Sequence, residues 1–213
     1  MKDTETLIAD LAGPNLTPAK PVGLCRYVSF WTLGLTLYVA AVFIFGILRL
    51  RPDLAAFASQ PFFMAEIAAL VLLAFSTIIA SAVLAYPDLY RHAYLAHAPW
   101  IGLVLFIGVL VLSWLHSANT VALTWQGFEC LSCITLLSLL PAAGMLYGIK
   151  RMATVVPDQA GMTAALCAFS VGALILRLSE QTDSIPHVVV WHYLPMLVVA
   201  MLGLWLGPKL LRW

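Results

Sequence analysis

Residues 62–85 read FFMAEIAALVLLAFSTIIASAVLA, an apolar run in which Glu66 is the charged side chain. A helix needs roughly 20 predominantly apolar residues to cross the hydrocarbon core of a bilayer, which is about 30 Å thick. Runs of similar length and character recur along the whole chain. The sequence therefore predicts six spans, at about 28–48, 62–85, 98–116, 127–148, 160–177 and 187–207.

The composition agrees with a membrane protein. Apolar residues make up 62% of the chain and charged residues 10%, far from the usual mix of a soluble domain. Lipid offers no hydrogen-bond partners, and unbroken apolar runs lack the in/out alternation of barrel strands. We therefore expect an all-α membrane protein, with a short tail over residues 1–27 and a bundle of six transmembrane helices over residues 28–213.

The distribution of Lys and Arg predicts the orientation. One set of predicted segments carries most of these residues, namely Lys2, Lys20, Arg26, Arg91, Lys150, Arg151, Lys209 and Arg212. The others, Arg49, Arg51 and Arg177, fall at the opposite ends of the first and fifth spans. Because cytoplasmic segments carry an excess of Lys and Arg, we expect both termini to be cytoplasmic and the tail to be exposed there.

Thiol and ionisable groups gather in the outer half of the predicted bundle. Thiolate, imidazole and carboxylate groups bind zinc, and soft thiolates also bind copper(I). Cys130 and Cys133 share a helix face, and Glu129 lies four residues before Cys133. The sequence suggests a metal site built from Cys130, Cys133, Glu129, His187 and His192, with Glu66, His116 and Glu180 as further contributors.

The spacing of the two histidines limits such a site, and two other interpretations of these residues stay open. His187 and His192 are five residues apart, which separates them by about 140° on an ideal α-helix. One helix cannot aim both at one ion unless Pro186 and Pro195 distort its start. If the two cysteines face an oxidising periplasm, a disulfide would make thiol oxidation a rival signal. Buried structural thiols and histidines that face headgroups are the simplest interpretation.

The tail carries a short apolar stripe formed by Leu7, Ile8 and Leu11, and Gly13-Pro14 ends it. A helix of about nine residues is too short to be stable alone in water. Such a marginal amphipathic segment is typical of a peptide that folds into the groove of a protein partner. We expect these three residues to be the partner-binding anchors.

Several short motifs together carry a resemblance. They are LIADL at 7–11, RPDL at 51–54, Cys130-Leu131 followed by LSLLP ending at Pro141, DSIPHVVVWHYLP at 183–195 and LLRW at 210–213. In this combination the chain resembles the NrsF family of six-span bacterial membrane proteins. The resemblance implies a negative regulator of an extracytoplasmic-function sigma factor in the inner membrane. The tail would hold the sigma factor until a periplasmic signal releases it.

The same resemblance bears on the cysteines. Members of the family often carry one Cys at the start of the fourth span and another in the loop before the sixth, which implies a sensing pair. Cys130 matches the first position, Glu180 stands at the second, and Cys133 is an addition. This departure shifts the expectation toward Cys130 with Cys133, or toward a mixed Cys/His/carboxylate metal site.

Other functional classes receive less support. A small ion or metal transporter or channel would also place Glu66, Glu129 and His192 inside a bundle, but it should carry polar groups through the full depth. The inner halves of the predicted spans offer few beyond Ser and Thr. No HExxH, Walker-type loop or GxSxG motif is present, so we expect no enzyme activity. With a net charge of +1 and no basic stripe, nucleic-acid binding is not expected.

Overall fold

The computed structural model describes residues 3–5, 23–86, 92–116, 127–152 and 154–212. The elements within these ranges are helical, and six helices are long and apolar enough to cross a membrane. The predicted all-α fold with six transmembrane helices is therefore confirmed. The tail residues Leu7, Ile8 and Leu11 lie outside the described residues, so their role stays a prediction.

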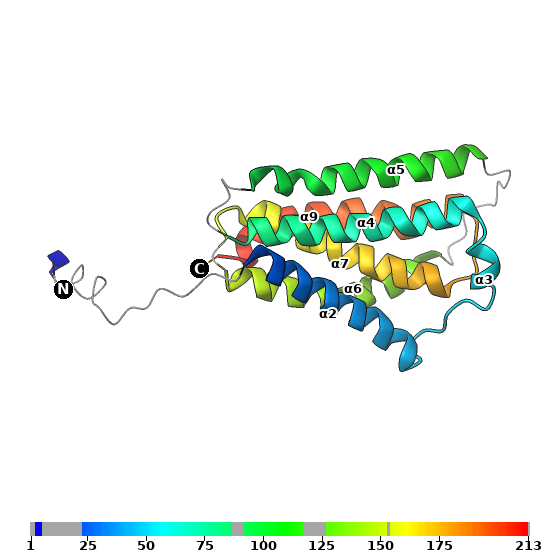
Figure 1. The fold of residues 1–213 in the computed structure, drawn as a ribbon, viewed down its shortest axis with the longest axis horizontal. Coiled ribbons are helices and arrows are strands. Elements are labelled where there is room, and N and C mark those ends of the chain that lie inside the picture. Colours follow the sequence, from blue (N-terminus) through cyan, green and yellow to red (C-terminus); the bar gives the residue numbers. More distant parts are fainter. Residues whose placement is uncertain (1–2, 6–22, 87–91, 117–126, 153, 213) are drawn as a thin grey trace.

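The long helices lie side by side in an elongated bundle (Figure 1). Their bounds are α2 (Leu24–Ile44), α4 (Pro61–Leu84), α5 (Ala98–His116), α6 (Gly127–Lys150), α7 (Pro157–Ser179) and α9 (Leu194–Leu210). Shorter elements are α3 (Leu54–Phe57), the 3₁₀-helix η2 (Ala93–His97), α8 (Ile185–His187) and the π-helix η3 (Val188–Tyr193). We call the end where α2 begins and α9 ends the terminal end, and the opposite end the distal end.

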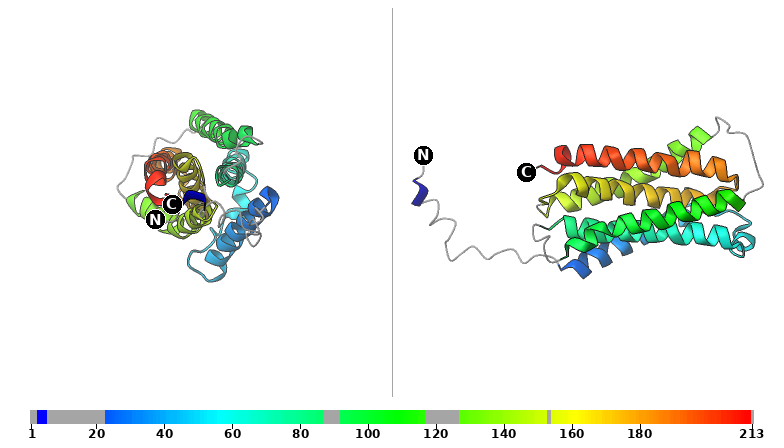
Figure 2. Two further views of the ribbon diagram at one scale, coloured as in Figure 1. Left: turned by 90° about the vertical axis from the view of Figure 1, so that its left-hand side faces the viewer. Right: turned by 90° about the horizontal axis from the view of Figure 1, so that it is seen from above.

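Helix α7 forms the centre of the bundle. In the most apolar stretch of α7, 78% of the residues are buried, and the helix packs against α4, α6 and α9. The view along the bundle in Figure 2 shows α5 at the edge, where it packs against α4. The membrane-length segments therefore surround one buried helix, whose last residue precedes Glu180.

A close crossing of α7 and α9 depends on glycine. A Cβ atom added at Gly161 would lie 2.4 Å from the carbonyl oxygen of Gly203 and 2.6 Å from Cα of Gly207. Small residues let membrane helices approach closely and gain van der Waals contact. This crossing sets how α7 lies against the helix that continues from η3, so it helps to position the polar groups at the distal end.

Candidate metal centre and the adjoining ion-pair network

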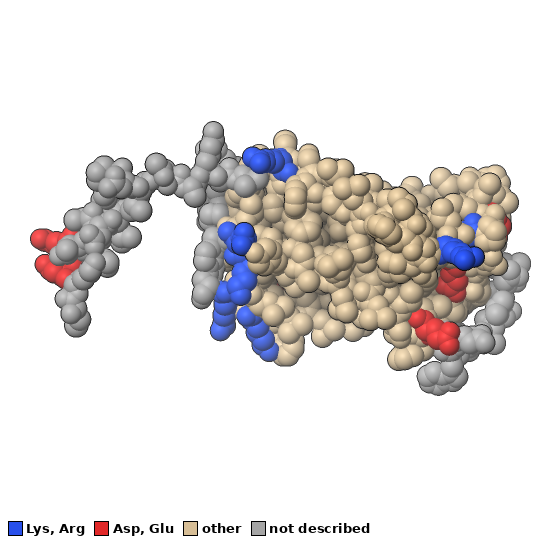
Figure 3. Space-filling model, turned by 90° about the horizontal axis from the view of Figure 1, so that it is seen from below, with Lys and Arg blue, Asp and Glu red and all other residues tan. Residues whose placement is uncertain are grey.

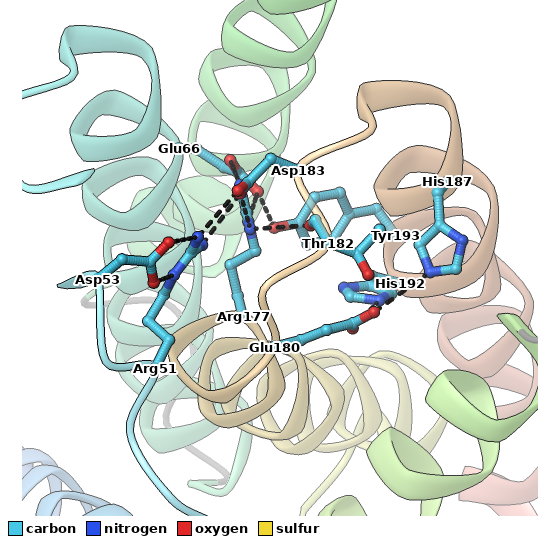
Figure 4. A network of polar contacts seen from close by, with 10 residues as sticks. All are labelled: Arg51, Asp53, Glu66, Arg177, Glu180, Thr182, Asp183, His187, His192 and Tyr193. Atoms are coloured by element: carbon cyan, nitrogen blue, oxygen red, sulfur yellow. Dashed lines mark hydrogen bonds and ion pairs between the residues drawn. The ribbon is translucent and has the colours of Figure 1, made fainter. Parts of the chain in front are cut away.

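Four side chains with metal-ligand chemistry meet at the distal end. They are Cys130 on α6, Glu180 directly after α7, His187 at the end of α8 and His192 in η3. One ligand-type atom from each lies within 4.8 Å of the others. Figure 4 shows Glu180 and the two histidines pointing toward one another. We call these four residues the Cys–Glu–His–His cluster.

The distances within the cluster are short. Sγ of Cys130 lies 3.5 Å from Oε1 of Glu180 and 3.6 Å from Nε2 of His187. Nε2 of His187 lies 3.5 Å from Oε1 of Glu180, and Nε2 of His192 lies 3.0 Å from Oε2 of the same carboxylate. Glu180 therefore lies within contact distance of all three other members.

The π-helix explains how both histidines reach one point. In a π-helix the backbone hydrogen bonds link residues five apart, so residues five apart come to lie on the same face. The segment between Pro186 and Pro195 adopts this form over Val188–Tyr193. The rings of His187 and His192 consequently lie 5.5 Å apart, centroid to centroid. The separation of about 140° that an ideal α-helix would impose does not apply here.

Burial and unmet hydrogen bonding mark the cluster as unusual. The side chain of His192 is fully buried. Its Nδ1 has no hydrogen-bond partner among the described residues, and its Nε2 faces Oε2 of Glu180 at 3.0 Å, an ion pair when the imidazole is protonated. Buried polar groups without a partner cost about 1–3 kcal/mol each, so native structures keep few of them.

The electrostatics of Glu180 favour a carboxylate. Burial raises the pKa of its carboxyl group, but His192, Thr182 and Cys130 together lower that pKa by more, and the net result is a pKa of about 2. The group is therefore ionised at neutral pH. A negatively charged oxygen next to two imidazole rings and a thiol is a suitable ligand set for a divalent cation.

The structure places the other predicted metal-site residues outside these four. Glu129 and Cys133 line an open pocket of about 360 Å³ together with Cys130 and Glu180. They lie beside the cluster and contribute no atom to the group of four. His116 ends α5, where its Nδ1 lies 2.9 Å from the carbonyl oxygen of Leu112. His116 therefore contacts the backbone of its own helix.

Glu66 belongs to a buried ion pair. The guanidinium of Arg177 donates hydrogen bonds to Glu66 from Nε at 2.9 Å and from Nη2 at 3.3 Å. The hydroxyl of Tyr193 donates a further hydrogen bond to Glu66. Charged groups inside the apolar part of a membrane protein are costly unless they are paired, and this pair meets that requirement.

Asp183 joins two arginines at the distal end. Arg51 donates to it from Nη1 at 3.0 Å and from Nη2 at 2.8 Å, and Arg177 donates to it from Nη1 at 3.1 Å. Arg51 also forms two hydrogen bonds with Asp53, at 2.7 and 3.0 Å. These contacts raise the pKa of the Arg51 guanidinium and lower the pKa of the Asp53 carboxyl. Figure 4 shows both arginines directed at Asp183.

Sequence reasoning missed this network. It used Arg51 and Arg177 to orient the chain, and it used Arg51, Asp53, Asp183 and Tyr193 only as letters of the family motifs, without a structural role. A signal was present, because an arginine beside or within an apolar span requires an acidic partner. Glu66 and Arg177 were both placed toward the same side of the predicted membrane.

Comparison with known proteins gives the family. The family model described as NrsF, negative regulator of sigma F, matches residues 14–213. The chain is also similar to the "Probable anti-sigma-F factor NrsF" of Azospira oryzae, with 27% identity over 225 residues that cover 100% of this chain and 99% of that protein. No solved structure matches the chain. The resemblance seen in the sequence motifs is thus confirmed, and the chain belongs to the NrsF family of negative regulators of sigma F.

Proposed function

We propose that this chain is an anti-sigma factor of the bacterial inner membrane. It holds an extracytoplasmic-function sigma factor at the cytoplasmic face through its tail, and releases that factor when a metal ion or an oxidant acts on the periplasmic side. The observation that carries this proposal is the match to the NrsF family, which extends from residue 14 to the last residue. It favours a regulator over the transporter or channel alternative.

The charge distribution supports the proposed orientation. At the terminal end the described basic residues are Arg26, Lys150, Arg151, Lys209 and Arg212. At the distal end the described basic residues are Arg49, Arg51 and Arg177, and the latter two are paired with acids. Figure 3 shows Lys and Arg gathered at the terminal end. Because cytoplasmic segments are enriched in Lys and Arg, the terminal end faces the cytoplasm and the cluster faces the periplasm.

A regulator of this kind needs two states that differ in affinity for the sigma factor, and a signal that favours one of them. The contacts at the distal end supply a physical route. Glu180 of the cluster and Asp183 of the ion-pair network belong to the same short connection between α7 and α8. Asp183 binds Arg51, which follows α2, and the other end of α2 carries the tail.

The tail residues are proposed as the anchors on the strength of their pattern. Leu7, Ile8 and Leu11 precede the range that the family model matches, whereas the alignment with the Azospira oryzae protein covers the whole chain. On a helix these three side chains form one stripe, and Ala9 lies on the opposite face. A substitution at Ala9 therefore gives a matched control.

The test is co-purification of the full-length protein, in detergent, with sigma factors of its own organism. We expect the wild type to retain one sigma factor, and Leu7→Asp combined with Leu11→Asp to lose it. Ala9→Asp adds the same kind of charge on the other face and should keep it. If the wild type retains none, the anti-sigma proposal fails. If the double variant still retains it, the tail is not the binding segment.

A further inference from the structure

The donor atoms of the Cys–Glu–His–His cluster are those that zinc takes in proteins. Zinc binds thiolate sulfur, imidazole nitrogen and carboxylate oxygen, most often four of them in a tetrahedron. The cluster offers one sulfur, one carboxylate and two imidazole rings. Copper(I) prefers sulfur ligands, and this group contains only one. The chemistry of the set therefore points to zinc.

The spacing of these atoms is close to that of a tetrahedral site. Ligand atoms bonded to one zinc ion at about 2.0–2.3 Å lie about 3.3–3.8 Å from one another. In the cluster Sγ of Cys130 lies 3.5 Å from Glu180 and 3.6 Å from His187. The carboxylate oxygens of Glu180 lie 3.5 Å from His187 and 3.0 Å from His192. Small side-chain movements suffice to close the four groups around an ion.

An independent observation points to a ligand at this place. Nδ1 of the fully buried His192 has no hydrogen-bond partner among the described residues, and Nε2 of the same ring has only the carboxylate oxygen Oε2 of Glu180, 3.0 Å away. A native structure that keeps such atoms in its interior requires an explanation. A metal ion bound by the His192 ring would account for a buried imidazole whose polar contacts are incomplete.

The backbone also points to a built site. The π-helix aligns His187 with His192, and such helices are rare and occur frequently at functional sites. The four ligands come from α6, the end of α7, α8 and η3. An ion would therefore link the fourth, fifth and sixth long segments at the distal end.

We infer that Cys130, Glu180, His187 and His192 bind one zinc ion in a tetrahedral site. Binding replaces the thiol proton of Cys130, which passes to water, so that the sulfur coordinates as thiolate. Cys133 is not a ligand, which distinguishes this site from a sensor built on a thiol pair. The metal site rests on the geometry alone. Its role as the place where the signal acts rests on the proposed function.

Cobalt(II) titration of the purified full-length protein in detergent tests the site. Cobalt occupies zinc sites and reports both thiolate ligation and tetrahedral geometry in its absorption spectrum. We expect one equivalent of cobalt to give a thiolate-to-cobalt charge-transfer band and intense d–d bands, and one equivalent of zinc to remove both. Weak octahedral-type bands, or the absence of a thiolate band, would overturn the inference.

Two cysteine variants give a matched comparison. Cys130→Ser should eliminate the charge-transfer band. It should also weaken cobalt binding by more than about 10–100-fold, which is the loss caused by removing a residue that only supports a ligand. Cys133→Ser is the same substitution less than one helical turn away, and it should leave the spectrum and the stoichiometry unchanged. Equal losses in both variants would contradict the proposed ligand set.

Glu180→Cys gives a test that does not depend on disrupting the buried histidine. Because cysteine is itself a zinc ligand, this variant should still bind one cobalt ion and should show a stronger thiolate band. An unaltered spectrum would remove Glu180 from the site. None of these measurements involves a sigma factor, so their failure would leave the anti-sigma proposal standing. Loss of sigma-factor binding would likewise leave the metal site standing.

Discussion

Arg51 donates two hydrogen bonds to Asp183, with N···O distances of 3.0 and 2.8 Å, although 132 residues separate them in the sequence. Asp183 belongs to the short connection that also carries Glu180, a member of the Cys–Glu–His–His cluster. Arg51 belongs to the segment between α2 and α3. The pair therefore joins the candidate metal centre to the first long helix, and the two sites should not respond independently.

Substitution of Asp183 should lower the stability of the protein, because Asp183 connects Arg51 and Arg177. Asp183→Asn preserves the shape of the side chain but removes the charge that the buried guanidinium groups of Arg51 and Arg177 share. We expect a loss of about 1–3 kcal/mol in the free energy of unfolding, because hydrogen-bonded partners of charged groups are removed. Thermal unfolding in detergent measures it.

Asp53→Asn is the matched control for that variant. The side chain of Asp53 is 42% exposed, against 32% for Asp183, and its hydrogen bonds go to Arg51 alone among the described residues. Exposed ion pairs contribute little, so this variant should lower the melting temperature clearly less. If both variants cost the same, Asp183 has no special bridging role.

The buried pair of Glu66 and Arg177 predicts a non-additive double variant. Their relative exposures are 3% and 2%. Removal of one charge leaves the other buried without its partner, so Arg177→Met should cost about 3–5 kcal/mol. Combined with Glu66→Leu, much of that loss should be recovered, because apolar residues often replace a buried ion pair at little cost. Denaturant-induced unfolding of the four proteins in the cycle measures the coupling. Additive losses would show that the pair is not energetically linked.

The crossing of α7 and α9 predicts a steric effect at Gly161. A Cβ atom there would lie 2.4 Å from a backbone oxygen of the facing helix, and backbone cannot rotate away. Gly161→Ala should therefore destabilise the bundle by about 1–3 kcal/mol, as overpacked cores do. Gly34→Ala is the control, because a Cβ atom at Gly34 meets nothing within 4 Å. Unfolding of Gly161→Ala at the wild-type temperature would rule out the close crossing.

The membrane-spanning helices could be predicted from the sequence because each depends on the composition and length of one continuous segment. A run such as 62–85 is too apolar for water and long enough for a bilayer, and these properties follow from composition and length alone. How helices pack is not local in this sense. The burial of α7 and its contact with Gly203 and Gly207 depend on which faces meet in space.

The candidate metal site could be predicted from the sequence only in part. Cys130, His187 and His192 could be selected by residue type, and Glu180 was reached through its place in the family pattern. A distortion near Pro186 and Pro195 was the condition under which both histidines could reach one ion, but the sequence did not show that this distortion takes the form of a π-helix. The contact between Arg51 and Asp183 was missed for another reason: it joins two connections that come together only in the folded bundle.

The proposed orientation leads to a labelling prediction. Ser59 is exposed in the distal segment between α3 and α4, and Arg151 is exposed at the terminal end. In a background in which the native cysteines are replaced by serine, Ser59→Cys should react with a membrane-impermeant maleimide once the outer membrane is permeabilised. Arg151→Cys should react only after lysis, because the basic terminal end faces the cytoplasm. Reaction of Arg151→Cys in unlysed cells would reverse the topology, and it would place the cluster on the side of the sigma factor rather than across the membrane from it.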